Sequence, residues 1–311
     1  MSEAVMECVP NFSEGVDSDR VRAIVGSMKG EGVSLLDWSM DSDHNRSVVT
    51  IAGSPDAVVQ AAVRAVGMAA RLIDLTAQRG VHPRIGAADV IPFVPVSGMS
   101  LEQCVLYARQ AGWEIWKRYG VPVYFYGAAA ARPDRAELED VRRGQFEGLR
   151  ELVLREAARR PDIGGPELHP TAGATAVGAR RFLVAYNLYL DKPDVAAARA
   201  IAKAIRASAG GLKGIKAMGV LAQDRAQVSM NITDLSVTGV GDVFAAVSGL
   251  ASRYGAKVVD GELIGLLPEQ AFEPDSEWVR LLIGFKPEEK ILERRLRRPL
   301  EWPVVPSDAL K

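Results

Sequence analysis

The chain has 311 residues, more than one ordinary hydrophobic core holds, and this length predicts two domains or subdomains. Apolar residues make up 48% and charged residues 25%, as in average globular proteins, so a sizeable buried core is expected. The formal net charge is -1. Nucleic-acid-binding proteins usually carry a basic excess, so no nucleic-acid partner is expected.

The N-terminus and the apolar runs indicate neither export nor membrane insertion. The first five residues, MSEAV, include an acidic residue and no apolar signal-peptide region, so no secretory signal is expected. No stretch approaches about 18 uninterrupted apolar residues, and we expect a soluble, cytoplasmic protein without a membrane partner. Cys8 and Cys104 both lie in apolar runs, which is typical of buried free thiols, with a nucleophilic cysteine as the alternative.

The first half of the chain alternates between strand-like and helical patterns. Short apolar or β-branched runs predict strands at 5–10, 33–38, 46–52 and 88–94. Apolar residues at helical spacing predict helices at 17–29, ended by Gly30, and at about 54–75, begun by Ser54 and Pro55. The order β-α-β-β-α-β is that of the ferredoxin-like, split βαβ unit. A helix at 100–119 and a strand at 122–126 follow.

The second half repeats this order after an interruption at 127–175. A charged helix at about 135–159 and a Pro/Gly-rich stretch at 161–173 indicate a connector. The elements predicted after the connector are strands at 182–188, 214–221, 226–232 and 257–259, helices at 193–209 and 239–254, a polar turn at Gln223-Asp224, and a C-terminal helix with a tail over 285–311. The sequence therefore predicts an α+β protein (an α/β sandwich) of two ferredoxin-like βαββαβ subdomains, 1–178 and 179–311. One large α/β sheet is the alternative.

The loop that contains His82 connects the second long predicted helix to the fourth strand. Pro83 restricts His82 to extended geometry, and Gly80 and Gly86 permit close approach of a ligand. Arg84 lies on the same side as His82 if the segment is extended, and a nearby arginine keeps an imidazole neutral, the form that a general base needs. A turn with a surface histidine explains the loop equally well.

A second polar cluster, residues 41–46 (DSDHNR), lies at a strand-to-strand turn. Asp, Ser and Asn dominate such turns, so turn chemistry is one explanation. Ligand contacts are the other, with Arg46 gripping a carboxylate. Asp41, Asp43 and His44 would also suit a divalent metal, but no HExxH, EF-hand or paired CxxC pattern supports one, and no metal is predicted.

The connector carries the third histidine of the chain, His169. Gly164, Gly165 and Gly173 would let backbone amides face an anion or a flat ring. A Walker-A loop is absent, and Gly-x-Gly-x-x-Gly does not follow a strand, so a nucleotide cofactor has little support. Gly-x-Ser-x-Gly is also absent, so a serine hydrolase is not indicated.

Six ordered segments of the chain resemble the glutamate formimidoyltransferases. They are ECVPNFSEG (7–15), DHNRSVVT (43–50), GVHPRIGAADVIPFVP (80–95), PVYFYG (122–127), GATAVGARRFLVAYN (173–187) and GLLP (265–268). The resemblance spans about residues 5 to 295, nearly the whole chain. Because the chain ends soon after residues 285–287, it resembles the free-standing bacterial type rather than the animal fusions with a C-terminal cyclodeaminase.

The resemblance implies transfer of a formimino group from N-formimino-L-glutamate to N5 of tetrahydrofolate, in histidine degradation. It also implies tetrahydrofolate as co-substrate, helices on the outer faces of two subdomains, a folate groove between them, and a homodimer. In the family the histidine of His-Pro-Arg is catalytic, here His82, and the folate-binding stretch maps to about 164–173. Two positions depart from vertebrate members: Ser39 replaces the second Asp of Asp-x-Asp, and Ala172 replaces a Trp.

A single acid–base histidine is the mechanism that we expect. N5 loses a proton as it attacks the amidine carbon, and the departing glutamate nitrogen gains one; a histidine that titrates near neutrality suits both steps. The formimino group is cationic, so Asp41, Asp43 or Asp89 would stabilise it, and Arg46, Arg84 and Arg180 would clamp substrate carboxylates. The full set of residues expected to bind substrate is Asn11, Asp43, His44, Asn45, Arg46, Arg84, Asp89, Gly164, Gly165, His169, Thr171, Gly173 and Arg180.

Three other functions remain open at this point. A relative in the same superfamily would move a formyl group between glutamate and folate. A catalytically idle protein would bind folate without turnover. A metal-dependent hydrolase would use the three histidines as ligands.

Overall fold

The computed structural model describes residues 3–222 and 224–305, and by its internal contacts the chain divides into two units. Unit 1 comprises the chain up to Arg180 together with the residues from Pro299 onward, and unit 2 comprises Arg181–Arg298. Each unit has its own sheet, so the protein is a mixed α+β structure, and the alternative of one large sheet is wrong. The predicted second subdomain, 179–311, differs from unit 2 at its end, because Leu300 pairs with Leu35 of unit 1.

Five strands of the unit 1 sheet, β1 to β5, pair in antiparallel fashion and occupy four neighbouring positions. β1 and β2 share one position, because both pair with β4 on one side and β5 on the other, and β3 pairs with β4. β7 and β6 then extend the sheet in parallel beyond β5. The strands are β1 (Val5–Cys8), β2 (Asn11–Phe12), β3 (Val33–Asp41), β4 (Arg46–Gly53), β5 (Ala88–Ser97), β6 (Val123–Gly127) and β7 (Thr175–Ala179).

Three long helices of unit 1 lie within the segments predicted as helical, but the first ends at Ser27, three residues before the predicted stop at Gly30. They are α1 (Ser18–Ser27), α2 (Pro55–Leu72) and α3 (Leu101–Tyr119). Asp17 accepts hydrogen bonds from the first turn of α1, and Ser100 forms a capping box with Gln103 on α3. Ser54 precedes α2 as predicted, but its side chain makes no capping hydrogen bond. Gly120 ends α3 with a φ of 63°, a conformation that favours glycine.

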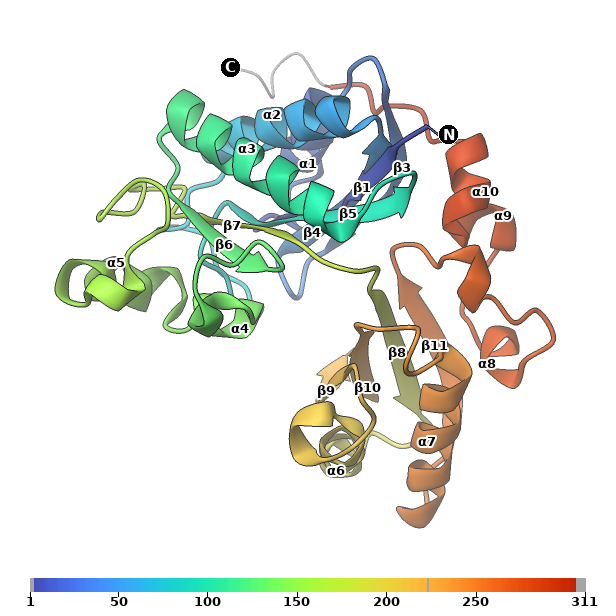
Figure 1. Cartoon of the computed structure of the whole chain (residues 1–311). Helices are drawn as coiled ribbons and strands as arrows, with labels where there is room; N and C mark the ends of the chain where they lie inside the picture. Colours follow the sequence, from blue (N-terminus) through green and yellow to red (C-terminus); the bar gives the residue numbers. More distant parts are fainter. Residues whose placement is uncertain (1–2, 223, 306–311) are drawn as a thin grey trace. The chain divides into compact units, whose positions relative to one another are not determined.

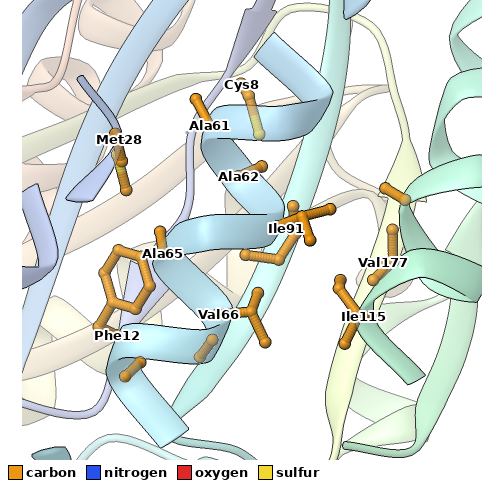
Figure 2. Packing of buried hydrophobic residues seen from close by; sticks show 14 of the residues in the cluster. Cys8, Phe12, Met28, Ala61, Ala62, Ala65, Val66, Ile91, Ile115 and Val177 are labelled. Carbon is orange, nitrogen blue, oxygen red and sulfur yellow. The ribbon is translucent and has the colours of Figure 1, made fainter. Parts of the chain in front are cut away.

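The main core of unit 1 lies between these helices and the sheet. Figure 2 shows Ala65 and Val66 of α2 with Phe12 on one side and Ile91 on the other. Small residues on α2 let the helix approach the strands closely, and Val58, Ala62, Val66, Ala69 and Ile73 are all buried, as their helical spacing predicted. Cys8 and Cys104 are buried free thiols, which confirms the prediction, and burial raises the pKa of both.

A smaller core lies around β6, where Val141 and Leu149 pack with Tyr124 and Tyr126. The helix predicted at about 135–159 is wrong, because this segment is broken at Gly144, whose φ of 90° no right-handed helix accommodates. The pieces are the 3₁₀ turn Pro133–Arg135, α4 (Leu138–Val141), α5 (Gln145–Arg155) and the 3₁₀ turn Ala157–Arg159. Figure 1 shows α4 and α5 away from α1, α2 and α3.

Unit 2 repeats the order β-α-β-β-α-β with antiparallel strands in the order β11-β8-β10-β9. Its strands are β8 (Val184–Leu190), β9 (Ile215–Ala222), β10 (Arg225–Ile232) and β11 (Val258–Ile264). Its helices are α6 (Val195–Ile205), α7 (Val240–Arg253), α8 (Glu277–Arg280), α9 (Pro287–Lys290) and α10 (Leu292–Arg297), with 3₁₀ turns at Ala207–Ala209 and Glu269–Ala271. Apolar residues from the sheet, α6 and α7 form its core.

Several sequence predictions need correction. β7 was not predicted, because its sequence TAVGA is short, small and without alternation. The C-terminal helix expected within 285–311 is two short helices, α9 and α10, separated at Ile291. At the predicted polar turn, Gln223 lies outside the described residues, as do Met1 and Ser2 of the N-terminus. None of the helices within residues 3–222 and 224–305 combines the length and the hydropathy of a membrane-spanning segment.

Candidate functional site

Asp89 is the centre of a buried charge cluster in unit 1. β5 pairs with β2 through Val90 and Ala88, and the register shift between them leaves Asp89 at a β-bulge. The Asp89 side chain is fully buried, and its Oδ1 accepts a hydrogen bond from the backbone N–H of Ile85 at 2.8 Å. An unpaired buried carboxylate costs several kcal/mol, so Asp89 at this bulge needs cationic partners to remain ionised.

Two arginines supply the positive charge. Nη1 of Arg46, the first residue of β4, donates to Oδ2 of Asp89 at 2.9 Å, and Nη2 of Arg142, which follows α4, donates to the same oxygen at 2.5 Å. Burial alone would raise the pKa of Asp89, but Arg142 and Arg46 outweigh it and hold this pKa at about 2. Burial lowers the pKa of Arg46 to about 10. At neutral pH the three groups therefore carry one surplus positive charge, which favours an anionic ligand.

Arg142 was not among the sequence-predicted site residues. It is one of many arginines in a charged segment, and no spacing rule links it to Asp89, 53 residues earlier in the chain. Its side chain is only 14% exposed, and its Nε has no hydrogen-bond partner within the described residues. Arg142 therefore keeps one buried donor without an acceptor among the described residues.

His82 lies against this cluster. Its Nδ1 is 3.1 Å from Nη1 of Arg46 and 2.8 Å from the carbonyl oxygen of Pro83. The two contacts exclude one another, because Nδ1 either accepts from Arg46 or carries a proton and donates to Pro83. Burial, then Arg46, then Arg142 lower the pKa of His82 to about 3, so the imidazole is neutral at physiological pH.

Arg84, expected beside His82, bonds elsewhere. Its guanidinium is buried and donates to both carboxylate oxygens of Glu147 at 2.9 and 3.1 Å and to Gln78. It also donates to the backbone carbonyl of Leu75. Arg84 therefore ties the His82 loop to α5, and the arginine that keeps His82 neutral is Arg46.

His44 brings a second imidazole to the same place. Asp41 ends β3, and its Oδ2 lies 2.9 Å from Nδ1 of His44, while its Oδ1 accepts from the His44 backbone N–H at 2.8 Å. The rings of His44 and His82 have centroids 6.2 Å apart in an edge-to-face arrangement. The structure therefore brings together two of the three histidines, from loops nearly forty residues apart.

Two asparagines support this cluster, one through the Arg46 side chain and one through the surrounding backbone. Asn11 accepts from Nε of Arg46 at 3.1 Å and so fixes the guanidinium. Asn45 has a φ of 48°; its Oδ1 accepts from Gly15 N–H at 2.9 Å and its Nδ2 donates to the carbonyl of Arg79 at 2.6 Å. Asn45 therefore joins the β3–β4 turn to the loop that carries His82.

The third histidine, His169, stabilises a turn of the connector. Its Nδ1 accepts from Ala172 N–H at 3.0 Å and from Thr171 N–H at 3.4 Å, and its backbone pairs with that of Gly173. Burial lowers the pKa of His169. Gly173 also pairs with Gly86, which joins this turn to the segment between His82 and β5.

The remaining predicted residues lie in separate positions. Gly164 packs against the ring of Trp116 on α3, and a Cβ there would lie 2.6 Å from it. Arg180 hydrogen-bonds to the buried phenol of Tyr126. Asp43 is exposed in the β3–β4 turn. Gly165 neighbours Gly164 before a cis peptide bond to Pro166, Ser39 lies opposite Val48 on β4, and Ala172 is buried.

The three histidines and their neighbouring carboxylates are the residue types that bind metal ions. Among residues 3–222 and 224–305, no three His, Cys, Asp or Glu side chains are grouped so that they would hold a metal ion. His82 and His44 instead contact arginine, a backbone carbonyl and aspartate. These contacts suit proton transfer and anion binding.

Two family models match the chain. The one described as the formiminotransferase domain, N-terminal subdomain, matches residues 5–180, and the one described as the formiminotransferase domain matches residues 185–280. The boundary between the two matches falls where unit 1 gives way to unit 2.

The chain is similar in sequence to proteins named as formimidoyltransferases. The chain is 42% identical over 295 residues to a glutamate formimidoyltransferase of Streptococcus pyogenes serotype M1, which covers 94% of this chain and 98% of that protein. It is 42% identical over 300 residues to a glutamate formimidoyltransferase of Thermoplasma acidophilum, covering 95% and 98%. It is 40% identical over 280 residues to the formimidoyltransferase-cyclodeaminase of Mus musculus, covering 87% of this chain and 51% of the mouse protein.

Proposed function

Because the chain belongs to the formiminotransferase family, we propose that the cluster around Asp89 and His82 is the reaction centre of its glutamate formimidoyltransferase activity. This activity is a folate-dependent one-carbon transfer of histidine degradation. The formimino group moves from the nitrogen of N-formimino-L-glutamate to N5 of tetrahydrofolate. The observation that carries the proposal is the contact between His82 and Arg46, because it joins a neutral imidazole to a cluster with surplus positive charge.

His82 is the proposed general base. N5 attacks the amidine carbon of the donor and must lose its proton as the new C–N bond forms. When Nδ1 of His82 carries a proton and donates to the Pro83 carbonyl, Nε2 presents a lone pair for that proton. In this tautomer Nδ1 does not accept from Arg46, so Arg46 acts on the ring through its charge, and the Pro83 contact favours the form that acts as a base.

Arg46 and Arg142 are proposed to bind a carboxylate of the donor. Asp89 neutralises only one of the two guanidinium charges, and Nε of Arg142 has no partner among the described residues. A substrate carboxylate would supply the missing negative charge. It would also weaken the positive field on His82 and raise its pKa toward neutrality, so that base strength would increase when the donor is bound.

Tetrahydrofolate is the co-substrate of this family, and the connector turn is its proposed contact. The support is the pairing of Gly173 with Gly86, four residues beyond His82, together with the match of the family's folate-binding stretch to about 164–173. His169 and Thr171 lie in this turn. Gly164 and Gly165 would contribute from the earlier part of the stretch.

We further propose that both units are ferredoxin-like subdomains. In unit 1 the first four strand positions follow the order β5, β1 with β2, β4, β3, and in unit 2 the order is β11-β8-β10-β9. When the four strands of each βαββαβ unit are numbered 1 to 4 in chain order, both sheets have the spatial order 4-1-3-2. A cytoplasmic homodimer remains the expectation for the assembly, which sedimentation of the purified chain would test.

The direct test is turnover. Purified protein is incubated with N-formimino-L-glutamate and tetrahydrofolate, and the N5-substituted folate is followed by its absorbance and by mass. The same assay with N-formyl-L-glutamate distinguishes a formyl-transferring relative. Folate binding without product from either donor would contradict the proposal and would indicate an idle folate-binding protein.

A further inference from the structure

The β3–β4 turn holds a histidine with a dedicated carboxylate. Both oxygens of Asp41 bond His44, one to the backbone N–H at 2.8 Å and one to Nδ1 at 2.9 Å. The ring is therefore fixed in orientation, and Nδ1 is committed as the proton-bearing nitrogen facing Asp41. Nε2, on the other side of the ring, makes no contact with Asp41 and remains available.

This pair lies beside the proposed base. The centroids of the His44 and His82 rings are 6.2 Å apart, and the loop of His82 packs directly on the turn, because a Cβ at Gly80 would lie 2.5 Å from the His44 carbonyl oxygen. His44 and Asp41 side chains retain 42% and 54% exposure, so a substrate can reach them.

The two imidazoles have opposite electrostatic surroundings. His82 faces Arg46 and Arg142, which oppose a positive ring, whereas His44 faces a carboxylate, which stabilises one. Asp89 opposes this effect only in part, because one carboxylate faces two arginines. Two titratable groups whose environments differ in this way are suited to separate acid and base roles.

On the basis of the proposed function, we propose that His44, held by Asp41, is the general acid that protonates the departing glutamate nitrogen. N5 of the folate bonds to the amidine carbon and its proton passes to neutral His82. The bond between that carbon and the glutamate nitrogen then breaks, and the nitrogen takes the electron pair and a proton from the His44 imidazolium. One proton leaves N5 and one reaches glutamate, and transfer from His82 to His44, directly or through water, restores both rings.

A purely structural role for the pair makes a different prediction. As a turn clamp, Asp41 needs only to accept from the His44 backbone, and an asparagine at position 41 does this equally well. As an acid, His44 needs the negative charge of Asp41. The charged and titratable groups around His44 are Asp41 and Asp43 on its own turn, Arg46 at the base of the turn, and Arg79 and His82 on the loop packed against it.

The test compares His44→Asn and Asp41→Asn with wild type in the formimino-transfer assay from pH 5 to 10. We expect His44→Asn to lower kcat about 10²–10⁴-fold with little change in KM for tetrahydrofolate, and to abolish the decline of kcat at alkaline pH. Asparagine keeps a donor near the position of Nδ1, so the turn should fold. We expect Asp41→Asn, which keeps the backbone hydrogen bond but removes the negative charge facing His44, to lower kcat as well. Added imidazole should partly restore kcat of His44→Asn.

The matched control is Asp234→Asn in unit 2, where a turn carboxylate also accepts from a backbone N–H, here two residues on instead of three. It should leave the pH profile unchanged. Wild-type kcat in His44→Asn, or a loss with the alkaline decline still at its wild-type pH, would overturn the acid role while leaving the proposed function intact. Inactivity of the wild-type chain toward formiminoglutamate would overturn the proposed function and this inference with it.

Discussion

Nη1 of Arg46 lies 3.1 Å from Nδ1 of His82, and the same nitrogen donates to Asp89 at 2.9 Å. The protonation of His82 is therefore coupled to the charge state of a buried ion-pair cluster. Any change in that cluster, by mutation or by an anionic ligand, alters the basicity of the imidazole.

The positive charge of Arg142 should lower the pKa of His82 without contacting it. We expect Arg142→Gln to raise this pKa by roughly one unit, because one of the two opposing cations is removed while the Arg46–Asp89 pair stays. The measurement is the pH titration of the His82 ring by NMR. Arg143→Gln is the control, since Arg143 is 75% exposed and pairs with Asp140. Equal pKa values in the two variants would contradict the prediction.

The imidazole of His82 should be needed for turnover but not for folding. We expect His82→Asn to lower kcat about 10²–10⁴-fold, the usual loss when a general acid–base is removed. Binding of tetrahydrofolate, measured by fluorescence titration, should change little. A variant with wild-type turnover and intact folate affinity would show that another group takes the proton from N5.

Stability should fall in mild acid because of His82. In the unfolded chain this histidine takes up a proton near its ordinary pKa of about 6.5, whereas the folded state keeps it neutral down to about pH 3. Between these values the unfolded state binds more protons, so lowering the pH favours unfolding, by about 1–2 kcal/mol at pH 5. Urea unfolding at pH 7 and pH 5 measures this loss. His82→Asn should lose less stability than wild type over the same interval, and an equal loss would argue against the depressed pKa.

Removal of the Asp89 charge should destabilise unit 1 strongly. Asp89→Asn leaves Arg46 and Arg142 without a counter-charge in a buried site, and we expect a loss of about 3–5 kcal/mol in the free energy of unfolding. Asp140→Asn removes an exposed partner of Arg143 and should cost less than about 1 kcal/mol. Comparable denaturant midpoints for the two variants would mean that the buried cluster contributes little.

Gly173 should be irreplaceable where the connector meets the His82 segment. Its φ is 69°, and a Cβ would lie 2.1 Å from the carbonyl oxygen of Ile85. We expect Gly173→Ala to destabilise unit 1 by at least about 2 kcal/mol in thermal unfolding. Gly148→Ala, on helix α5 with open space around the new methyl, should instead stabilise by about 0.5–1 kcal/mol. A harmless Gly173→Ala would show that the turn can move.

Local sequence patterns were sufficient to predict most helices and strands of this protein. The apolar spacing of residues 54–75 and the β-branched run at 46–52 suffice for the βαββαβ order, because periodicity follows directly from which face a helix or strand buries. The ordered motifs identified His82 and the family. This logic weakens at several places: the helix predicted at 135–159 is broken by the positive φ of Gly144, the C-terminal helix is split at Ile291, and β7, which was not predicted, consists of small residues without alternation.

Only the tertiary structure decided how the site is built. Asp89 contacts Arg46 and Arg142, which are 43 and 53 residues away in the sequence. The partner of a buried polar residue cannot be found from hydrophobic periodicity, because periodicity reports only which face of an element is apolar. The sequence therefore placed Arg84 beside His82, whereas packing against α5 directs Arg84 to Glu147 and leaves Arg46 to set the charge on the histidine. Burial and distance determine electrostatics, and both are properties of the folded chain.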